Sequence, residues 1–219
     1  MPNYIRNKLV IGSRVSEVLD FVKSAESLFD FNKICPMPEG LDITEGSLGD
    51  DGMEYLTLVA AGHPWGQKKA EEIKTRLEKN GYLEEALTLG KQYLVNIATT
   101  GHRTWYGWCC EHWGTKWNAS EVSMVSDDTI VFTTAWSGVI ELLEKLSAKF
   151  PDVLFRYKFS SEDTGFNCGR GIISNGTANM VIPVGGSKEC YEIAFEMWPE
   201  SKAYYKLVGD KYEYRDEDE

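Results

Sequence analysis

The feature of this sequence that most constrains its fold is a β-α-β pattern that occurs twice. Residues 4–11 have the pattern of a strand, residues 15–22 place apolar side chains at helical spacing, and residues 29–35 have the pattern of a second strand. The same succession returns at residues 129–159, where two strand-like segments flank a helix closed by Pro151. Two such halves are typical of a ferredoxin-like sandwich, in which four antiparallel strands are backed by two helices. We therefore predict an α+β, ferredoxin-like fold.

The remaining segments extend this core. Helical periodicity between the two halves predicts a helical insertion, and an Asn-Gly turn at 175–176 followed by further short strands predicts a C-terminal β-rich extension. The predicted domains are a ferredoxin-like α+β domain with its C-terminal extension at residues 1–38 and 119–214, a helical insertion at 54–118, and an acidic, disordered tail at 215–219.

The overall charge of the chain is strongly negative. Of 219 residues, 34 are Asp or Glu and 23 are Lys or Arg, which gives a net charge of −11. Such a field repels a phosphate backbone, so direct nucleic-acid binding is not expected. No apolar run approaches the roughly 20 residues of a membrane span, and the N-terminus lacks the apolar region of a signal peptide. We expect a cytoplasmic protein without membrane contact.

Acidic residues gather in two segments. Residues 39–54 hold six acidic residues, four glycines and no basic residue, which predicts an exposed loop. The second segment is the tail, with Asp216, Glu217, Asp218 and Glu219. Charge runs most often only solvate the surface, but a folded frame would orient the residues of the loop for a partner.

Cysteine and histidine gather in a tryptophan-rich segment, residues 102–117. The five cysteines of the chain are an odd set without framework-like spacing, which predicts reduced thiols. Cys109 and His112 share a helical face, but two ligands do not complete a tetrahedral zinc site. No third group orients the same pair as a nucleophile. We predict no metal, no cofactor and no enzyme, with an enzyme that uses Cys109, His112 or His102 as an alternative.

One predicted strand has aromatic side chains on one side. Phe155, Tyr157 and Phe159 alternate with Leu154, Arg156 and Lys158. The aromatic side either stacks RNA bases on an open sheet or packs in the core beneath the helices. Because the chain is acidic, we favour core packing and keep an RNA-binding module acting through the sheet as an alternative.

Several short motifs resemble a known family. They are Phe31-Asn-Lys-Ile34, Pro36-Met-Pro38, Trp113-Gly-Thr-Lys-Trp-Asn-Ala119, Thr134-Ala-Trp136, Phe150-Pro-Asp152 and Asp163-x-Gly165. In this order they resemble phage- and plasmid-borne proteins with a YubB-type ferredoxin-like domain. The resemblance implies a ferredoxin-like fold and a home on a mobile element, and it brings no catalytic residues.

The most specific of these motifs also has a structural interpretation. Trp113 and Trp117 lie four residues apart around Gly114, directly before a predicted strand. Thr115 and Asn118 are suited to satisfy backbone groups at a turn. We predict that Trp113 and Trp117 form a structural clasp where the insertion returns to the sheet.

The functional prediction combines the resemblance with the charge. We predict a non-enzymatic accessory protein of a phage or plasmid that binds a macromolecular partner in the host, plausibly a basic, nucleic-acid-binding defence complex that it inhibits. Its carboxylates would take the place of phosphates in a basic groove. Asp50, Asp51 and Glu54 of the acidic loop are the predicted partner-binding residues.

Overall fold

The computed structural model describes residues 3–215 and divides the chain into two compact units. The first unit comprises residues 1–36 and 109–219, and the second comprises residues 37–108. The predicted acidic tail from Asp216 onward lies outside the described residues. No helix within residues 3–215 is long and apolar enough to span a bilayer.

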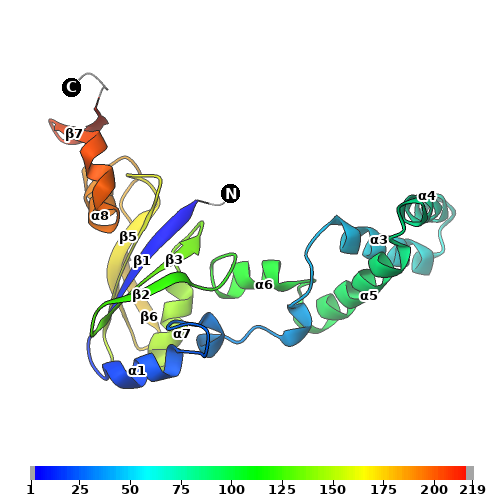
Figure 1. Cartoon of the computed structure of the whole chain (residues 1–219), viewed down its shortest axis with the longest axis horizontal. Coiled ribbons are helices and arrows are strands. Elements are labelled where there is room, and N and C mark those ends of the chain that lie inside the picture. Colours follow the sequence, from blue (N-terminus) through cyan, green and yellow to red (C-terminus); the bar gives the residue numbers. More distant parts are fainter. Residues whose placement is uncertain (1–2, 216–219) are drawn as a thin grey trace. The chain divides into compact units, whose positions relative to one another are not determined.

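The first unit is built on one antiparallel sheet of six strands in the order β2-β3-β1-β4-β5-β6 (Figure 1). The strands are β1 (Tyr4–Ile11), β2 (Ser120–Ser126), β3 (Thr129–Ala135), β4 (Phe155–Ser161), β5 (Cys168–Ser174) and β6 (Thr177–Val181). Helix α1 (Val15–Val22) follows β1, and helix α7 (Ile140–Lys149) follows β3. The first four strands and these two helices have the β-α-β-β-α-β order of a ferredoxin-like sandwich, which confirms the predicted α+β class.

One face of this sheet forms the core of the first unit. Alternate residues of β1, among them Ile5 and Leu9, are fully buried together with Val18 of α1 and Leu142 of α7. The aromatic side chains of β4 point the same way: Phe155, Tyr157 and Phe159 are all buried. Core packing, the favoured interpretation of the aromatic strand, is therefore confirmed.

A buried polar network crosses the same face. The Tyr157 hydroxyl donates to Asn7 Oδ1 at 2.5 Å and accepts from the backbone N–H of Val139 at 2.9 Å. Asn7 Nδ2 in turn donates to the hydroxyl of Thr134 at 2.9 Å. Burial raises the pKa of Tyr157, so the hydroxyl stays neutral and available as a donor. The network links the centre of the sheet to the start of α7.

The prediction of a strand at residues 29–35 is wrong. The segment contains a short helix, α2 (Phe31–Ile34), whose N-cap is Asp30, with its side chain accepting from Asn32 N at 2.9 Å. Phe29 and Phe31 are buried against Phe132 as a compact aromatic group, which a helical turn satisfies as well as a strand does. The first β-α-β half is completed instead by β2, so the helical residues are inserted within that half and not between the halves.

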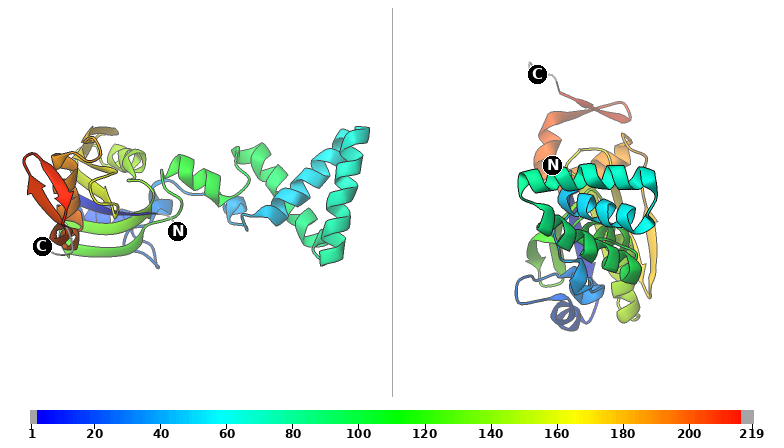
Figure 2. Two further views of the ribbon diagram at one scale, coloured as in Figure 1. Left: turned by 90° about the horizontal axis from the view of Figure 1, so that it is seen from above. Right: turned by 90° about the vertical axis from the view of Figure 1, so that its right-hand side faces the viewer.

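The second unit is helical. It contains a short 3-10 turn at Glu39–Leu41 and the helices α3 (Ser47–Ala61), α4 (Pro64–Asn80) and α5 (Leu83–Thr100), which pack on one another (Figure 2). Helix α6 (Trp105–His112) begins within the last residues of this unit. The compact unit at 37–108 is shifted toward the N-terminus relative to the predicted insertion at 54–118.

The predicted acidic loop at 39–54 is wrong over its second half, because α3 begins at Ser47. Gly52, one of the glycines that suggested a loop, serves helix packing together with Gly90 of α5. A Cβ on Gly52 would lie 1.7 Å from the carbonyl oxygen of Ala86, and a Cβ on Gly90 would lie 2.3 Å from the amide nitrogen of Met53. These glycines let α3 and α5 approach at backbone distance.

The C-terminal extension contains the predicted Asn-Gly turn and short strands, together with a helix and a 3-10 helix. Asn175 and Gly176 both have positive φ, 46° and 77°, as a type I′ turn between β5 and β6 requires. Helix α8 (Lys188–Met197) has Ser187 as its N-cap, and the Ser187 side chain accepts from Cys190 N. A 3-10 helix (Pro199–Tyr204) leads to a separate two-stranded sheet of β7 (Tyr205–Val208) and β8 (Lys211–Tyr214).

Candidate ligand-binding face of the sheet

The sheet face opposite the core carries a row of three cations. Lys8 of β1 is paired in register with Lys158 of β4, which is paired with Arg170 of β5. Side chains alternate between the faces of a strand, and these three lie on the side opposite buried Leu9, Tyr157 and Gly169. Neighbouring strands lie about 4.8 Å apart, so three positive charges follow one another across the sheet at that interval.

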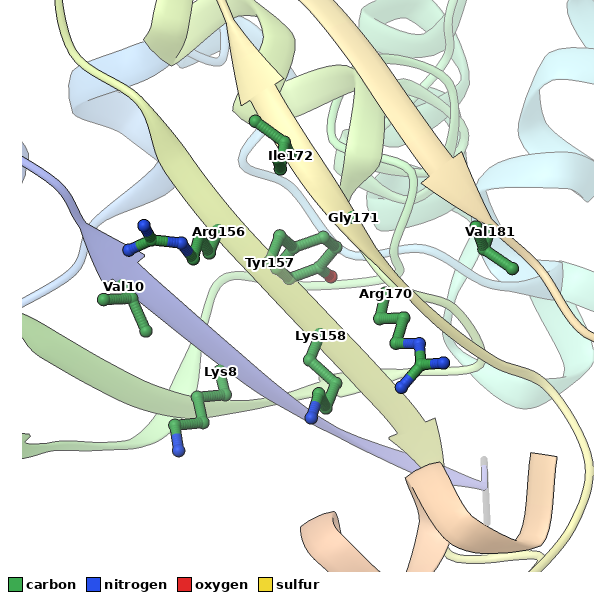
Figure 3. A pocket seen from close by; sticks show the side chains of 9 residues that line it. All are labelled: Lys8, Val10, Arg156, Tyr157, Lys158, Arg170, Gly171, Ile172 and Val181. Atoms are coloured by element: carbon green, nitrogen blue, oxygen red, sulfur yellow. The ribbon is translucent and has the colours of Figure 1, made fainter. Parts of the chain in front are cut away.

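The row borders a shallow depression of about 440 Å³. Figure 3 labels the residues that line it, which belong to β1, β4, β5 and β6. Four are cationic, and the apolar ones form the rest of the surface. The lining residues are Lys8, Val10, Arg156, Tyr157, Lys158, Arg170, Gly171, Ile172 and Val181. The depression therefore combines an apolar surface with a cationic border, and no acidic side chain lines it.

A second depression of about 490 Å³ lies across β2, β3 and β1 and is also lined by Lys8. Its other lining residues include the hydroxyls of Ser123 and Thr133 and the carboxylate of Glu121. Thr133 donates to Glu121 Oε2 at 2.9 Å, so that carboxylate is engaged within the sheet. Lys8 thus stands where the two depressions meet.

Helix α8 covers one end of this face. Its buried Cys190, Ile193 and Met197 pack on Cys168 of β5. Arg6 of β1 donates to the Met197 carbonyl at 2.8 Å, and its guanidinium carbon lies 3.8 Å from the centre of the Trp198 ring. The end of the face near Arg6 is therefore closed, while the part with Lys8 and Arg156 stays exposed.

The cations of the face differ in their partners. Lys158 pairs with Glu196, and Arg170 pairs with Glu189 at 2.8 Å, both glutamates belonging to α8. Lys8 and Arg156 form no ion pair within residues 3–215. Hydrogen bonds from Ser126 and Thr129 and, to a smaller degree, the charge of Arg156 hold the pKa of Asp128 below its usual range. Lys8 and Arg156 are thus the cations most available to a ligand.

The predicted partner-binding acids lie on α3, and each is paired within the second unit. Asp50 pairs with Arg103, Asp51 with Arg76, and Glu54 with Lys69. Their carboxylates are partly exposed, but the cations beside them cancel much of the negative charge that a basic partner would meet. The structure brings these three residues together on one helix, and their role in binding stays a prediction.

Trp113 and Trp117 occupy unequal positions. Trp113 is buried, stacks edge-on against Phe31 and donates from Nε1 to the carbonyl of Cys35 at 2.8 Å. Trp117 is half-buried beside Lys116, whose Nζ lies 5.1 Å from its ring centre. The segment between them is bonded to the sheet, because the Thr115 hydroxyl donates to the Ala135 carbonyl at 2.9 Å and accepts from the Ala135 N–H at 3.0 Å.

Asn118 completes this arrangement. Its side-chain oxygen accepts from the backbone N–H of Phe31 at 2.9 Å, and its side-chain nitrogen donates to Asp30 at 2.7 Å. The motif Trp113–Ala119 thereby ties residues 30–35 to the strands. This geometry suits the clasp that the sequence predicts.

The cysteines depart from the prediction of five reduced thiols. Cys168 and Cys190 form a disulfide between β5 and α8, with their Cα atoms 6.1 Å apart. The pairing depends on how α8 lies on the sheet, which spacing along the chain does not reveal. Cys35, Cys109 and Cys110 remain as thiols. Burial raises the pKa of Cys109 to about 12, a poor setting for the nucleophile of the alternative enzyme.

The cationic row was missed at the level of sequence, although part of its signal was visible. Arg156 and Lys158 alternate with the core aromatics, and Lys8 occupies the corresponding outward position of β1. Only the register of β1 against β4 shows that these positions are neighbours. The net charge did not indicate the row, because it sums the charges of the whole chain, whereas a ligand contacts only one part of the surface.

Comparison with known proteins identifies the fold of part of the chain. Residues 112–201 match the family described as "Ferredoxin-like domain in Api92-like protein". This range includes β4, β5 and α8 but not β1. The crystal structure of a protein api92 from Yersinia pseudotuberculosis aligns with a TM-score of 0.37 and 10% identity, over 85% of this chain and 99% of that one. No curated protein sequence matches.

Proposed function

We propose that this protein is a non-catalytic binding protein that holds a single-stranded nucleic acid on the exposed face of its six-stranded sheet. The observation that carries the proposal is the row Lys8, Lys158 and Arg170, placed opposite one another on three adjacent strands. A polyanion laid across the row would meet a cation on each of three adjacent strands.

The surroundings of the row fit a nucleic-acid strand better than a small ligand. The depressions are shallow and open onto one extended face, so they suit a chain that lies across several strands. Val10, Ile172 and Val181 offer apolar contact to sugars or bases, and arginine planes such as Arg156 stack on bases. Because the aromatic side chains of β4 are buried in the core, binding should depend little on base sequence.

The net charge of −11 sets the expected strength of binding. The rest of the surface repels phosphates, so only the local row attracts them, and the affinity should be modest and strongly dependent on salt. This proposal departs from the expectation drawn from net charge alone, because four cations surround one depression of an acidic protein.

The resemblance to the YubB-type family extends the proposal to biology. We propose on that basis that the protein works in the cytoplasm of a cell that carries its phage or plasmid. Inhibition of a host defence complex through Asp50, Asp51 and Glu54 stays a prediction. Lys8 and Arg156 are better placed to meet a partner than those acids, because the acids are already paired with Arg103, Arg76 and Lys69.

Fluorescence anisotropy with labelled oligonucleotides tests the proposal. Single-stranded RNA and DNA of about 16 nucleotides, the upper end of the site size of a small binding fold, are titrated with protein over a range of salt concentrations. The variant is Lys8→Gln with Arg156→Gln. The matched control is Lys23→Gln with Lys33→Gln, which removes the same charge at the end of α1 and in α2.

We expect the variant to bind more weakly than the control at low salt. The slope of log affinity against log salt should become shallower by about 1.4, because each single-strand phosphate contact contributes roughly 0.7. The RNA and DNA arms show whether the 2′-hydroxyl contributes. Absence of binding by the native protein at low salt, or equal slopes for variant and control, would show that the sheet face is not a nucleic-acid site.

A further inference from the structure

We propose that α8 competes with the nucleic acid for the sheet face, because Glu189 and Glu196 occupy two of the three row cations that phosphates would contact. This inference rests on the proposed function and concerns the regulation of the same site. It assigns to α8 a role in setting affinity and ligand length.

The two glutamates match the two cations in spacing. Glu189 and Glu196 are seven residues apart on α8, about two helical turns, so both side chains emerge on the same side. Glu196 reaches Lys158, and Glu189 reaches Arg170 at 2.8 Å. Lys158 and Arg170 are directly opposite one another on β4 and β5. The helix therefore presents two carboxylates to the row, as two phosphates of a strand would.

The body of α8 is fixed, whereas its competing side chains are exposed. The Cys168–Cys190 disulfide, the hydrogen bond from Trp198 Nε1 to the Ser160 carbonyl at 3.1 Å and the contact of Arg6 with Met197 hold the helix on the sheet. The side chains of Glu189 and Glu196 are 42% and 56% exposed. A phosphate can therefore displace either carboxylate by rotation of a side chain, without movement of the helix.

This arrangement favours long ligands over short ones. An exposed ion pair contributes little, so each glutamate weakens phosphate binding without preventing it. A single phosphate that displaces one glutamate gains only one new contact. Lys8 and Arg156 have no ion pair within the described residues. A nucleic-acid strand that also reaches these two cations gains contacts without breaking an ion pair of the protein. The glutamates should thus select for polyanions.

The test compares two variants that remove the same charge from neighbouring positions. Glu189→Gln with Glu196→Gln releases Lys158 and Arg170. The control, Glu192→Gln with Glu200→Gln, changes two exposed glutamates of α8 and the following 3-10 helix, which form no ion pair within residues 3–215. Both are titrated with the labelled oligonucleotide over a range of salt concentrations, and thermal denaturation checks that both fold.

We expect roughly tenfold tighter binding for Glu189→Gln with Glu196→Gln, the size of two surface ion pairs. Its salt slope should steepen by about 1.4, since two more cations meet phosphates without first losing a partner. The control should show a smaller gain and an unchanged slope, because more distant charges act through screened solvent.

The outcomes separate this inference from the function on which it rests. If the native protein binds, and Lys8→Gln with Arg156→Gln weakens binding, but Glu189→Gln with Glu196→Gln matches its control in affinity and slope, the competition is wrong and the binding face stands. If neither the native protein nor any variant binds, both proposals fail.

Discussion

At the scale of single residues, the two tryptophans of the clasp should contribute unequally to the stability of the protein. Trp113 is only 3% exposed and has a satisfied ring N–H, whereas Trp117 is half-buried. We expect Trp113→Ala to lower the free energy of unfolding by about 3–5 kcal/mol, the range for removing a buried large aromatic. Trp117→Ala should cost about 1–2 kcal/mol, in proportion to its smaller buried area. Denaturant unfolding measures both.

The control for the clasp is Trp65→Ala, since the side chain of Trp65 is 70% exposed at the start of α4. It should change stability by less than about 0.5 kcal/mol, as surface substitutions generally do. Equal losses of unfolding free energy for Trp113→Ala and Trp65→Ala would show that the motif has no structural role.

Glu45 makes the stability of the helical unit depend on pH. Burial acts to raise its pKa, but hydrogen bonds from Arg103 and Thr104 prevail and hold the pKa below the ordinary value of 4.5. A carboxylate whose pKa is lowered by folding stabilises the fold above its unfolded pKa and loses that effect as the pH falls through the folded value.

We therefore expect Glu45→Gln to lower stability at neutral pH and to flatten the loss of stability as the pH falls below 4.5. Glu84→Gln, on an exposed position of α5, should leave the profile unchanged. Thermal unfolding between neutral and acidic pH measures both variants. Parallel profiles for native protein and Glu45→Gln would contradict the assignment.

At the scale of elements, the crossing of α3 and α5 depends on glycine. The Cβ of an alanine at Gly52 would meet the backbone of Ala86, which no side-chain rotation can relieve. We expect Gly52→Ala to destabilise the protein by about 1–3 kcal/mol, the usual cost of overpacking. Gly46→Ala is the matched control, because nothing lies within 4 Å of its added Cβ. Circular dichroism at 222 nm, a wavelength dominated by helices, follows both on heating.

The attachment of α8 to β5 gives a second prediction at this scale. Titration of the unfolded protein without reductant should count three reactive thiols, from Cys35, Cys109 and Cys110, and five after reduction. Cys190→Ala should lower the free energy of unfolding by roughly 3 kcal/mol, the effect of a closed loop of about this length, with a sequence separation of 22 residues. Five reactive thiols without reductant would contradict the disulfide.

At the scale of the whole molecule, local signals predicted more than distant ones. The turn at Asn175-Gly176 follows from two neighbouring residues, and the structure confirms it. The strand prediction for residues 29–35 was wrong, because a short run of apolar aromatic residues fits a strand or a helical turn equally well. The second strand of the ferredoxin-like order comes only after the helical unit, so sequence proximity pointed to the wrong partner.

The candidate site shows the same limit more strongly. Lys8 and Lys158 become neighbours only through the pairing of β1 with β4, and Arg170 joins them through β5. Composition could not reveal the row, because a net charge of −11 contains no information about position. An outward-facing cation on each of several predicted strands is the pattern that would have indicated it.

The central claim is that the ligand lies on the exposed face of the sheet, and mapping of amide chemical shifts tests it most directly. Isotope-labelled protein is titrated with single-stranded RNA, and the shifted backbone amides are assigned. We predict that the shifts gather on β1, β4 and β5 around Lys8, Lys158 and Arg170. Shifts confined to α3 around Asp50 and Asp51, or no shifts at low salt, would contradict the account.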